Sequence, residues 1–294
     1  MRKLVIILVI ALIATSCNKK SLQPENCFFK EKDSYGRVIT LEAEPQRIVS
    51  LTPAITEITF LLHEEKKLVG VTDFCTYPPA AQKLPKVGKL LNINIETILA
   101  QRPDLVIIGS VVAKKDVLKM ERAGIPVFSI KEEKSVEDLF STIKMLGKLL
   151  NQSAAADSLI KNYQLDLQEI ENQTFSNRPS VYYVVGFGES GDFTAPGNSF
   201  INDIIQMAGG QNIGESLRTW NVSREFLFEQ DPDFIFIREE DCTQFCRTEP
   251  YTQLNAVRDH RVFPIPSGWM DILSPRNLQA VAFIHEKITP SPTH

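Results

Sequence analysis

Short apolar segments rich in β-branched residues alternate with helical patterns along most of this chain. Strands that are separated by helices are typical of a parallel α/β sheet. Each crossover helix returns the chain to the end of the sheet where the previous strand began, so the next strand runs parallel to it. The segments with strand character lie at 36–41, 47–51, 68–71, 103–109 and 125–130, and again at 181–185, 233–237 and 262–265. We therefore predict the α/β fold class.

Two consecutive helical patterns interrupt this alternation near the middle of the chain. Ser135, with acidic residues directly after it, is a typical helix start, and the pattern continues to Leu150. A second stripe of apolar residues at helical spacing covers about 154–172, and strand character returns after Pro179. We predict a first α/β unit at 36–134, a helical connector at 135–176 and a second α/β unit at 177–294.

The composition excludes one class of partner. A hydrophobic fraction of 43% and a charged fraction of 23% are ordinary for a folded domain. The net charge is −4 and the isoelectric point is near 5.7. Because nucleic-acid-binding proteins usually present a basic face, we expect no nucleic-acid partner.

The N-terminus has the pattern of an export signal. Arg2 and Lys3 precede an apolar run from 4 to 14, which is too short for a membrane span of about 20 residues. Small residues then lead into Cys17, an arrangement that resembles a bacterial lipobox. We predict a signal peptide at 1–16, lipidation of Cys17, a flexible tether at 17–35, and a lipid-anchored protein facing the periplasm or the cell exterior. The alternative is an ordinary secretory signal with a chance cysteine.

Four further cysteines could form disulfides in an exported protein. Cys242 and Cys246 are close in sequence and could close a small loop, which would leave Cys27 and Cys75 as the other pair. Sequence alone does not determine the connectivity, and free structural thiols remain an alternative. A zinc site is a weaker alternative because no histidine lies near the Cys242–Cys246 pair. We predict no bound metal and no resident cofactor.

Two segments in different halves of the chain share one pattern, in which a glutamate starts a helix, a Pro-Asp pair ends it and a strand follows. Glu96 opens a helix that stops at a Pro-Asp pair seven residues later, and a strand follows. Glu225 does the same in the second half. A carboxylate is favoured at a helix N-terminus by the helix dipole, so both glutamates could be simple helix caps. The repetition also predicts two related units, each with one glutamate at an equivalent corner.

Several motifs resemble those of class III ABC-transporter binding proteins, in order and over about residues 36 to 288. The strings that carry the resemblance are 47–57 (RIVSLTPAITE), 77–79 (YPP), 94–96 (NIE), 102–107 (RPDLVI), 222–225 (VSRE) and 274–276 (SPR). The resemblance implies two Rossmann-like α/β lobes joined by a single long rigid helix, with a ligand cleft between them. It also implies a monomer without enzymatic activity that delivers iron-siderophores, haem or cobalamin to a permease and its ATPase.

The resemblance gives the repeated glutamates a role. Glu96 and Glu225 match the positions where this family docks onto arginines of its membrane permease. One acidic side chain on each lobe would determine the register of docking through charge complementarity.

The ligand implied by the resemblance is a corrinoid, because the chain is most similar to the cobalamin-binding members of the family. A corrinoid is a wide, mostly apolar macrocycle with amide edges, so its receptor needs aromatic faces and a few hydrogen bonds. The expected ligand contacts are aromatic residues in loops at strand ends: Phe74, Tyr77, Phe193, Trp220 and Trp269.

Three positions depart from the cobalamin-binding pattern. Leu90 stands where those members have a tryptophan, and Gly268 and Ile272 replace an acid and a base that grip the corrin edge. Nearby charged residues could supply the missing acid and base: Asp271, Arg218 and Arg276.

A ferric siderophore or haem is the alternative cargo, and Tyr77 could serve haem as an axial ligand. A zinc or manganese receptor would need converging histidines, and the four in this chain are scattered. A surface adhesion lipoprotein would not need paired helix-start glutamates.

Overall fold

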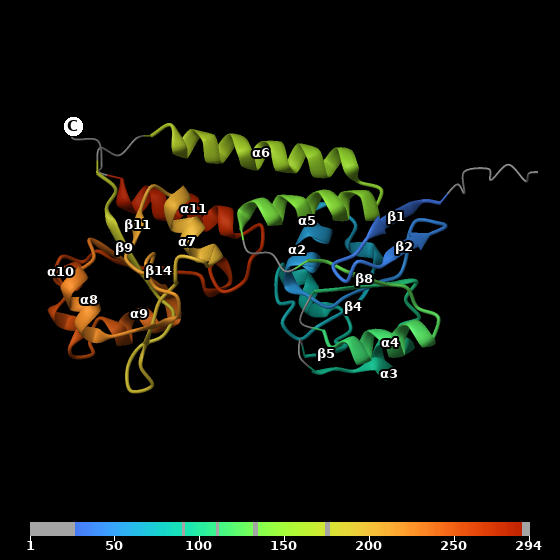
Figure 1. Ribbon diagram of the computed structural model, residues 1–294, viewed down its shortest axis with the longest axis horizontal. Coiled ribbons are helices and arrows are strands. Elements are labelled where there is room, and N and C mark those ends of the chain that lie inside the picture. The colour runs from blue at the N-terminus through green and yellow to red at the C-terminus, as the bar shows by residue number, and fades with distance from the viewer. Residues whose placement is uncertain (1–26, 90–91, 110–111, 132–134, 174–176, 290–294) are drawn as a thin grey trace, which may run out of the picture.

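The computed structural model describes residues 27–89, 92–109, 112–131, 135–173 and 177–289. Figure 1 shows two α/β lobes side by side, with helices running along one side of both. The predicted fold class, two α/β lobes joined by a long helix, is confirmed. The predicted signal peptide, Cys17 and Leu90 lie outside the described residues.

The N-terminal lobe is built on a parallel sheet in the order β4-β3-β7-β8. Its strands are β3 (Ile48–Ser50), β4 (Leu68–Val71), β7 (Leu105–Ile108) and β8 (Val127–Ser129). Alternate strand residues face α2 (Pro53–Leu61) and α5 (Val136–Leu149) on one side. The others face α3 (Ile95–Ala100) and α4 (Lys114–Arg122). Because both faces are covered, the strands are almost continuously apolar.

The C-terminal lobe repeats this arrangement with a parallel sheet in the order β11-β9-β13-β14. Its strands are β9 (Ser180–Val184), β11 (Gln211–Asn212), β13 (Phe234–Arg238) and β14 (Val262–Ile265). One face packs on α7 (Phe200–Met207) and α11 (Asn277–Ile288). The other packs on α8 (Arg224–Gln230) and on residues of α9 (Glu239–Phe245) and α10 (Asn255–Arg258).

Short elements decorate both lobes. Two-stranded ribbons pair β5 (Gly88–Lys89) with β6 (Asn92–Ile93) and β10 (Asp192–Phe193) with β12 (Asn221–Val222). The 3-10 turns are η1 (Glu65–Lys67), η2 (Pro79–Lys83), η3 (Tyr251–Gln253) and η4 (Ser267–Trp269).

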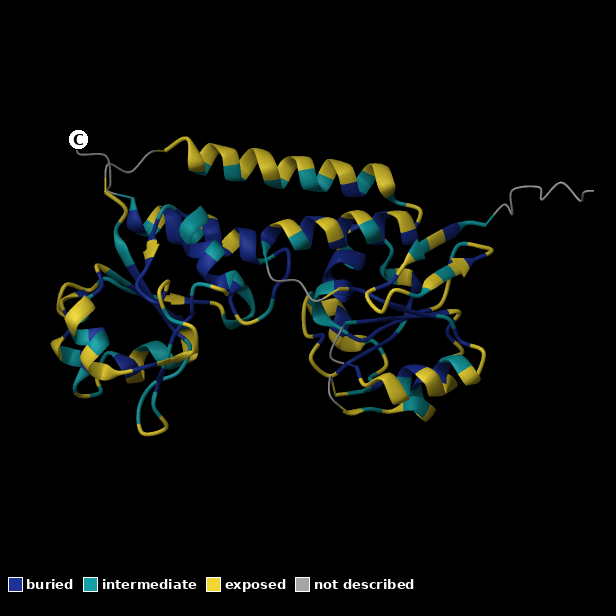
Figure 2. Ribbon diagram, in the orientation of Figure 1, coloured by how far each residue is buried: buried dark blue, intermediate teal, exposed yellow. Residues whose placement is uncertain are grey.

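The two helices of the predicted connector have different positions. Helix α5 contributes buried residues to the N-terminal core, so it belongs to that lobe. Helix α6 (Ser153–Glu171) crosses to the other lobe, and it is largely exposed in Figure 2. Leu167 on α6 packs against the cores of both lobes. Leu273, before α11, and Leu278, within its first turn, also pack into the N-terminal core. The lobes therefore share an apolar contact besides the bridging helix.

The predicted tether at 17–35 is wrong at its C-terminal end. Strand β1 (Phe29–Lys32) pairs antiparallel with β2 (Val38–Leu41), and Phe29 is only 4% exposed. The ring of Phe29 packs edge-on against Phe128 of the central sheet. A strand of this kind is stable only beside its partner, so its own four residues give a weak signal.

The disulfides considered from the sequence are not formed, and the four cysteines within the described ranges are free. Cys75 is fully buried, where its sulfur accepts a hydrogen bond from the Thr56 hydroxyl at 3.2 Å. Cys27 lies two residues before β1. Cys242 lies on α9 and Cys246 caps its C-terminus. Burial, and then the neighbouring Cys246, raise the pKa of Cys242 to about 11, so Cys242 is a neutral thiol at pH 7.

Candidate functional site

The five aromatic residues predicted to contact ligand all follow the carboxyl ends of strands. Phe74 and Tyr77 follow β4, Phe193 lies in the ribbon after β9, Trp220 follows β11 and Trp269 follows β14. In open parallel sheets, ligands bind outside the carboxyl ends of the strands. The order of the chain therefore brings aromatic side chains of both lobes to the edge where this fold can bind a ligand.

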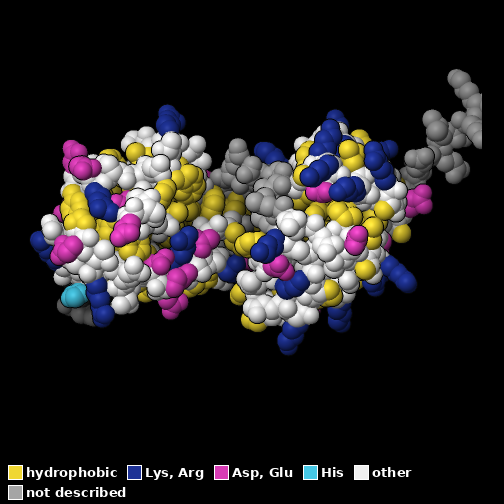
Figure 3. Space-filling model, turned by 90° about the horizontal axis from the view of Figure 1, so that it is seen from below, with side chains coloured by type: hydrophobic (Ala, Val, Ile, Leu, Met, Phe, Trp, Pro, Cys, Tyr) yellow, Lys and Arg dark blue, Asp and Glu magenta, His cyan; other side chains and the backbone are white. Residues whose placement is uncertain are grey.

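The exposure of these side chains differs. Phe74, Tyr77 and Trp220 are 56%, 42% and 41% exposed, which leaves much apolar area uncovered. Phe193 is half-buried. Trp269 is also half-buried and packs edge-on against Phe283, with ring centroids 6.2 Å apart, so part of its surface serves the core. Seen from below, Figure 3 shows hydrophobic side chains on both lobes along the waist between them.

Phe193 and Trp220 are brought together by the β10–β12 ribbon. Phe193 pairs with Asn221 in its register. The amide of Thr194 donates to the carbonyl of Trp220 at 2.8 Å. This ribbon was missed in the sequence, because two-residue strands carry no periodic signal.

Tyr77 lies beneath an ion pair that joins the two lobes. The guanidinium of Arg276, at the start of α11, is 4.5 Å from the centre of the Tyr77 ring. Its Nε and Nη2 donate to the Glu57 carboxylate on α2 at 2.9 and 2.7 Å. Glu57 is 2% exposed, and burial raises the pKa of its carboxyl although the hydrogen bonds from Arg276 act to lower it. We call Glu57 and Arg276 the interlobe ion pair.

This ion pair changes the interpretation of two predicted residues. Arg276 was considered as the base that grips a ligand, but Nε and Nη2 of its guanidinium are committed to Glu57. A Cβ atom at Gly268 would collide with Nη1 of Arg276, so a side chain at 268 is incompatible with this position of the guanidinium. Glu57 was quoted in the sequence motif without a role. Glu57 is the only charged residue of α2, and a single charge in a mostly apolar helix is a signal that could have found it.

Asp271, the other candidate acid, is paired inside its own lobe. The guanidinium of Arg238, at the end of β13, donates to the Asp271 carboxylate at 2.9 to 3.2 Å. The same guanidinium donates to the carbonyl of Val185. Arg238 was not identified from the sequence. Arg218 is exposed on the segment that leads to Trp220.

The two repeated glutamates occupy equivalent places. Glu96 and Glu225 are each the second residue of a helix, α3 and α8, and both are exposed. The caps of these helices are other residues. Asn94 accepts from the amide of Thr97 at 3.0 Å, and Ser223 accepts from that of Phe226 at 3.1 Å. The glutamate carboxylates are therefore not needed for capping, and one stands on each lobe.

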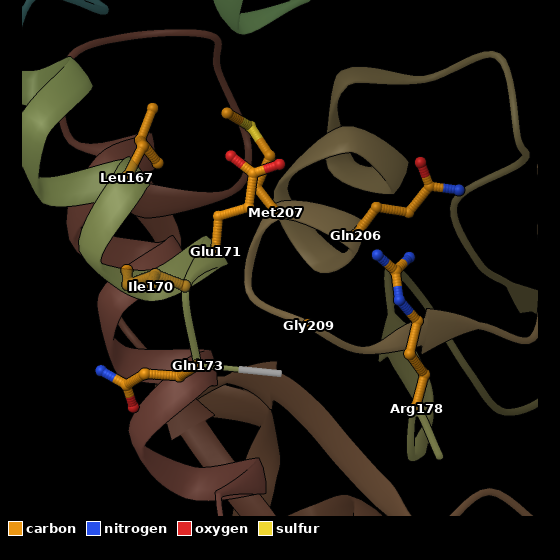
Figure 4. A pocket seen from close by; sticks show the side chains of 8 residues that line it. All are labelled: Leu167, Ile170, Glu171, Gln173, Arg178, Gln206, Met207 and Gly209. Atoms are coloured by element: carbon orange, nitrogen blue, oxygen red, sulfur yellow. The ribbon is translucent and has the colours of Figure 1, made fainter. Parts of the chain in front are cut away.

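A cavity of about 410 Å³ lies elsewhere, beside the C-terminal end of α6. Figure 4 shows Leu167 and Ile170 of α6 on one side and Met207 of α7 on the other. An open hollow of about 610 Å³ lies beside β5, β6 and Glu96. Neither is lined by a predicted ligand contact.

Two kinds of feature are absent from the described residues. No group of three or more histidine, cysteine, aspartate or glutamate side chains there could hold a metal ion. No helix in the same ranges is long and apolar enough to cross a membrane.

Comparison with known proteins gives a consistent result. A family model described as periplasmic binding protein matches residues 48–268. A Bacillus subtilis protein named "uncharacterized ABC transporter substrate-binding lipoprotein YvrC" is 29% identical, over 88% of this chain and 84% of its own length. A cobalamin-binding protein of Halobacterium salinarum is 32% identical, over 70% of this chain and 57% of its own length. The crystal structure of a periplasmic heme binding protein from Pseudomonas aeruginosa superposes with a TM-score of 0.75 at 26% identity, covering 84% of this chain and 94% of that one.

Proposed function

The chain belongs to the periplasmic binding protein family, and on that premise we propose that it captures a corrinoid of the vitamin B12 type between its lobes and delivers it to an ABC permease. The relatives that it matches are named as substrate-binding or ligand-binding proteins, not as enzymes. A small-molecule ligand, a permease and an ATPase are the partners that this family implies.

One observation carries the choice of a wide, flat cargo. The aromatic side chains left exposed at the strand ends come from both lobes, Phe74 and Tyr77 from one and Trp220 from the other. Apolar rings contributed by two lobes suit a macrocycle that presents one face to each lobe. The cobalamin-binding relative supports a corrinoid in particular.

Haem or another iron complex is the second candidate. Two observations favour it: the similarity to a haem-binding structure, and the exposed Tyr77, which could meet an iron atom. Glycine at 268 and isoleucine at 272 also remove the polar grip that the cobalamin-binding pattern implies.

Delivery is expected to need no chemistry in this protein. Loaded protein presents Glu96 and Glu225 to the permease, and ATP hydrolysis elsewhere releases the cargo. In this proposal the protein is an exported monomer held to the membrane by lipid on Cys17. We expect the lobes to rotate by only a few degrees on binding, because α6, the leucines before and in α11, and the interlobe ion pair all resist hinge motion. Free and loaded crystal structures that differ by a large rotation would contradict this.

Tryptophan fluorescence of the lipid-free protein tests the cargo. Trp220 and Trp269 are the only tryptophans of the chain, and both follow strand ends. Saturable quenching by cyanocobalamin at submicromolar concentration, corrected for absorption by the ligand, would support a corrinoid receptor. Single Trp220→Phe and Trp269→Phe variants show which tryptophan is quenched by the ligand. Saturation by haemin but not by cyanocobalamin would replace the corrinoid with haem.

A double variant tests docking. Glu96→Ala with Glu225→Ala is expected to keep ligand affinity and to abolish uptake in cells that depend on this importer. The matched control is Glu137→Ala with Glu169→Ala, which removes two exposed carboxylates on α5 and α6, away from α3 and α8. Loss of ligand binding in the first variant, or loss of uptake in the control, would contradict the docking role.

A further inference from the structure

A glycine-rich loop in the C-terminal lobe connects β9 to the strand that carries Phe193. The loop spans 186–191, and Gly188 and Gly191 adopt positive φ values of 100° and 104°, which favour glycine. Its Phe187 packs edge-on against Phe245 and Tyr251, at 5.2 and 5.7 Å between ring centroids. The other residues of the loop are glycine, glutamate and serine, so polar contacts rather than apolar side chains hold it.

The side chain of Arg224 contacts this loop. Its Nη2 donates to the carbonyl of Gly188 at 2.8 Å, and its Nε donates to the Asp192 carboxylate at 3.1 Å. The second acceptor comes directly before Phe193. One guanidinium therefore bonds both the loop at Gly188 and the start of β10 at Asp192. The planar guanidinium suits this role because its N–H donors have fixed relative directions.

The Asp192 carboxylate, which accepts from Arg224, is buried and has further hydrogen-bond partners. The Asp192 side chain is 1% exposed, and it also accepts a hydrogen bond from the hydroxyl of Tyr251. The amide of Gly188 donates to that hydroxyl at 3.0 Å. We call Gly188, Asp192, Arg224 and Tyr251 the Arg224 clamp. The Arg224 side chain is itself 44% exposed, so the contact joins a solvated guanidinium to a buried, hydrogen-bonded carboxylate.

The clamp joins the candidate ligand strand to the candidate docking corner. Arg224 is the first residue of α8, and Glu225 is the second. Strand β10 with Phe193 pairs with β12, and β12 leads through Ser223 into the same helix. Ligand contact and docking contact are thus separated by one ribbon and one ion pair.

The N-terminal lobe has a different connection at the equivalent place. There the amide of Asp73, next to Phe74, donates to the carbonyl of Gly88 at 3.0 Å. The amide of Asn94, before α3, donates to the carbonyl of Val87 at 2.8 Å. Both of these contacts are between backbone atoms, so a side-chain substitution can release the loop in the C-terminal lobe selectively.

We propose that Arg224 is a positioning residue that couples occupancy of the cleft, sensed at Phe193, to the order of the docking corner at Glu225. This inference rests on the proposed function. A ligand that orders β10 would also order the start of α8 through the clamp, which lowers the entropy that docking has to remove. By linkage, docking at Glu225 would tighten the hold on the ligand by the same factor.

Hydrogen–deuterium exchange on the intact, lipid-free protein tests the proposal. The proteins are wild type, Arg224→Gln, Arg224→Lys and the control Arg258→Gln, which removes an exposed guanidinium on another helix of the same lobe. Each is measured free, with saturating cyanocobalamin and with saturating haemin. In the free state we expect Arg224→Gln to speed exchange in peptides covering 186–192 by about tenfold, since the loop opens locally without its clamp. The control should match wild type.

The ligand arms test the coupling. In wild type, the bound probe should slow exchange at 186–193 and also at 222–226. In Arg224→Gln, protection at Phe193 should persist while protection at 222–226 disappears. Arg224→Lys should recover part of the protection at 222–226, because an ammonium keeps the charge but not the paired donors of the guanidinium. A merely structural role would leave that pattern unchanged. Unchanged exchange at 186–192 in free Arg224→Gln, or full protection at 222–226 in its loaded form, would overturn the proposal. If neither probe protects any amide of wild type, the proposed cargo is wrong and the coupling, which rests on it, is overturned with it. The free-state comparison then shows separately whether Arg224 holds the loop.

Discussion

Replacing Arg276 by leucine would break the interlobe ion pair and leave the buried carboxylate of Glu57 without its partner. Glu57 is 2% exposed, and the Arg276 side chain is 12% exposed. Leucine keeps part of the apolar stem but provides no donor, so the carboxylate would lose both hydrogen bonds. We expect the free energy of unfolding to fall by about 3–5 kcal/mol, the usual cost of removing one partner of a buried pair. Loss of the cation–π contact with Tyr77 adds about 0.5–1 kcal/mol.

The pH dependence of this loss has a definite sign. Burial already raises the pKa of Glu57, and without Arg276 the contacts that oppose this rise are gone. The folded variant then holds a proton that the unfolded chain releases, so its free energy of unfolding increases as pH falls towards the ordinary pKa of 4.5. The difference from wild type should therefore shrink between about pH 7.5 and about pH 5.

Urea unfolding followed by far-ultraviolet circular dichroism measures both effects. The control is the double variant Glu57→Leu with Arg276→Leu, which removes both charges. Apolar replacement of a whole buried pair is often neutral or stabilising, so we expect it to lie within about 1 kcal/mol of wild type. The reasoning would be refuted if Arg276→Leu cost less than about 1 kcal/mol, or if the double variant were as unstable as the single one.

Three further substitutions test other parts of the structure. Gly268→Ala is expected to lower the free energy of unfolding by about 1–3 kcal/mol, because the added Cβ displaces the Arg276 guanidinium. In the Glu57→Leu, Arg276→Leu protein the loss should be much smaller, and equal losses in both proteins would contradict the collision. The hydrogen bond from Lys67 lowers the pKa of Glu44, so the stability that this carboxylate contributes is complete above the ordinary value of 4.5 and is lost as pH falls through the folded pKa. Glu44→Gln should thus cost about 0.5–1 kcal/mol at neutral pH in urea unfolding and nothing in acid. Phe74→Ala should change stability by less than about 0.5 kcal/mol and weaken ligand binding about tenfold in the fluorescence titration, since its ring is exposed; a large loss of stability would mean that the ring packs instead.

The sequence predicted most of the regular elements because their causes lie within a few residues. Strands β4 and β14 have the bounds that their β-branched runs indicate. Helix α5 begins after Ser135, whose side chain accepts from the amide of Asp138. An N-cap acts over three residues and hydrophobic periodicity over a few turns, so both are visible in a short window. Strand β1, whose order depends on a partner further along the chain, was not predicted.

The candidate site divides in the same way. Two parts of the site could be predicted from the sequence: which aromatic residues follow strand ends, and that each half carries a helix-start glutamate. Both depend only on the order of residues along the chain. Two others could be seen only in the folded protein: Arg276 is committed to Glu57, 219 residues away, and Arg224 holds the loop before Phe193. Ion pairs and ribbons of this kind form between segments that meet only after both sheets have folded and packed. Their free energy depends on burial and geometry, and neither is encoded in the spacing of the residues that make them.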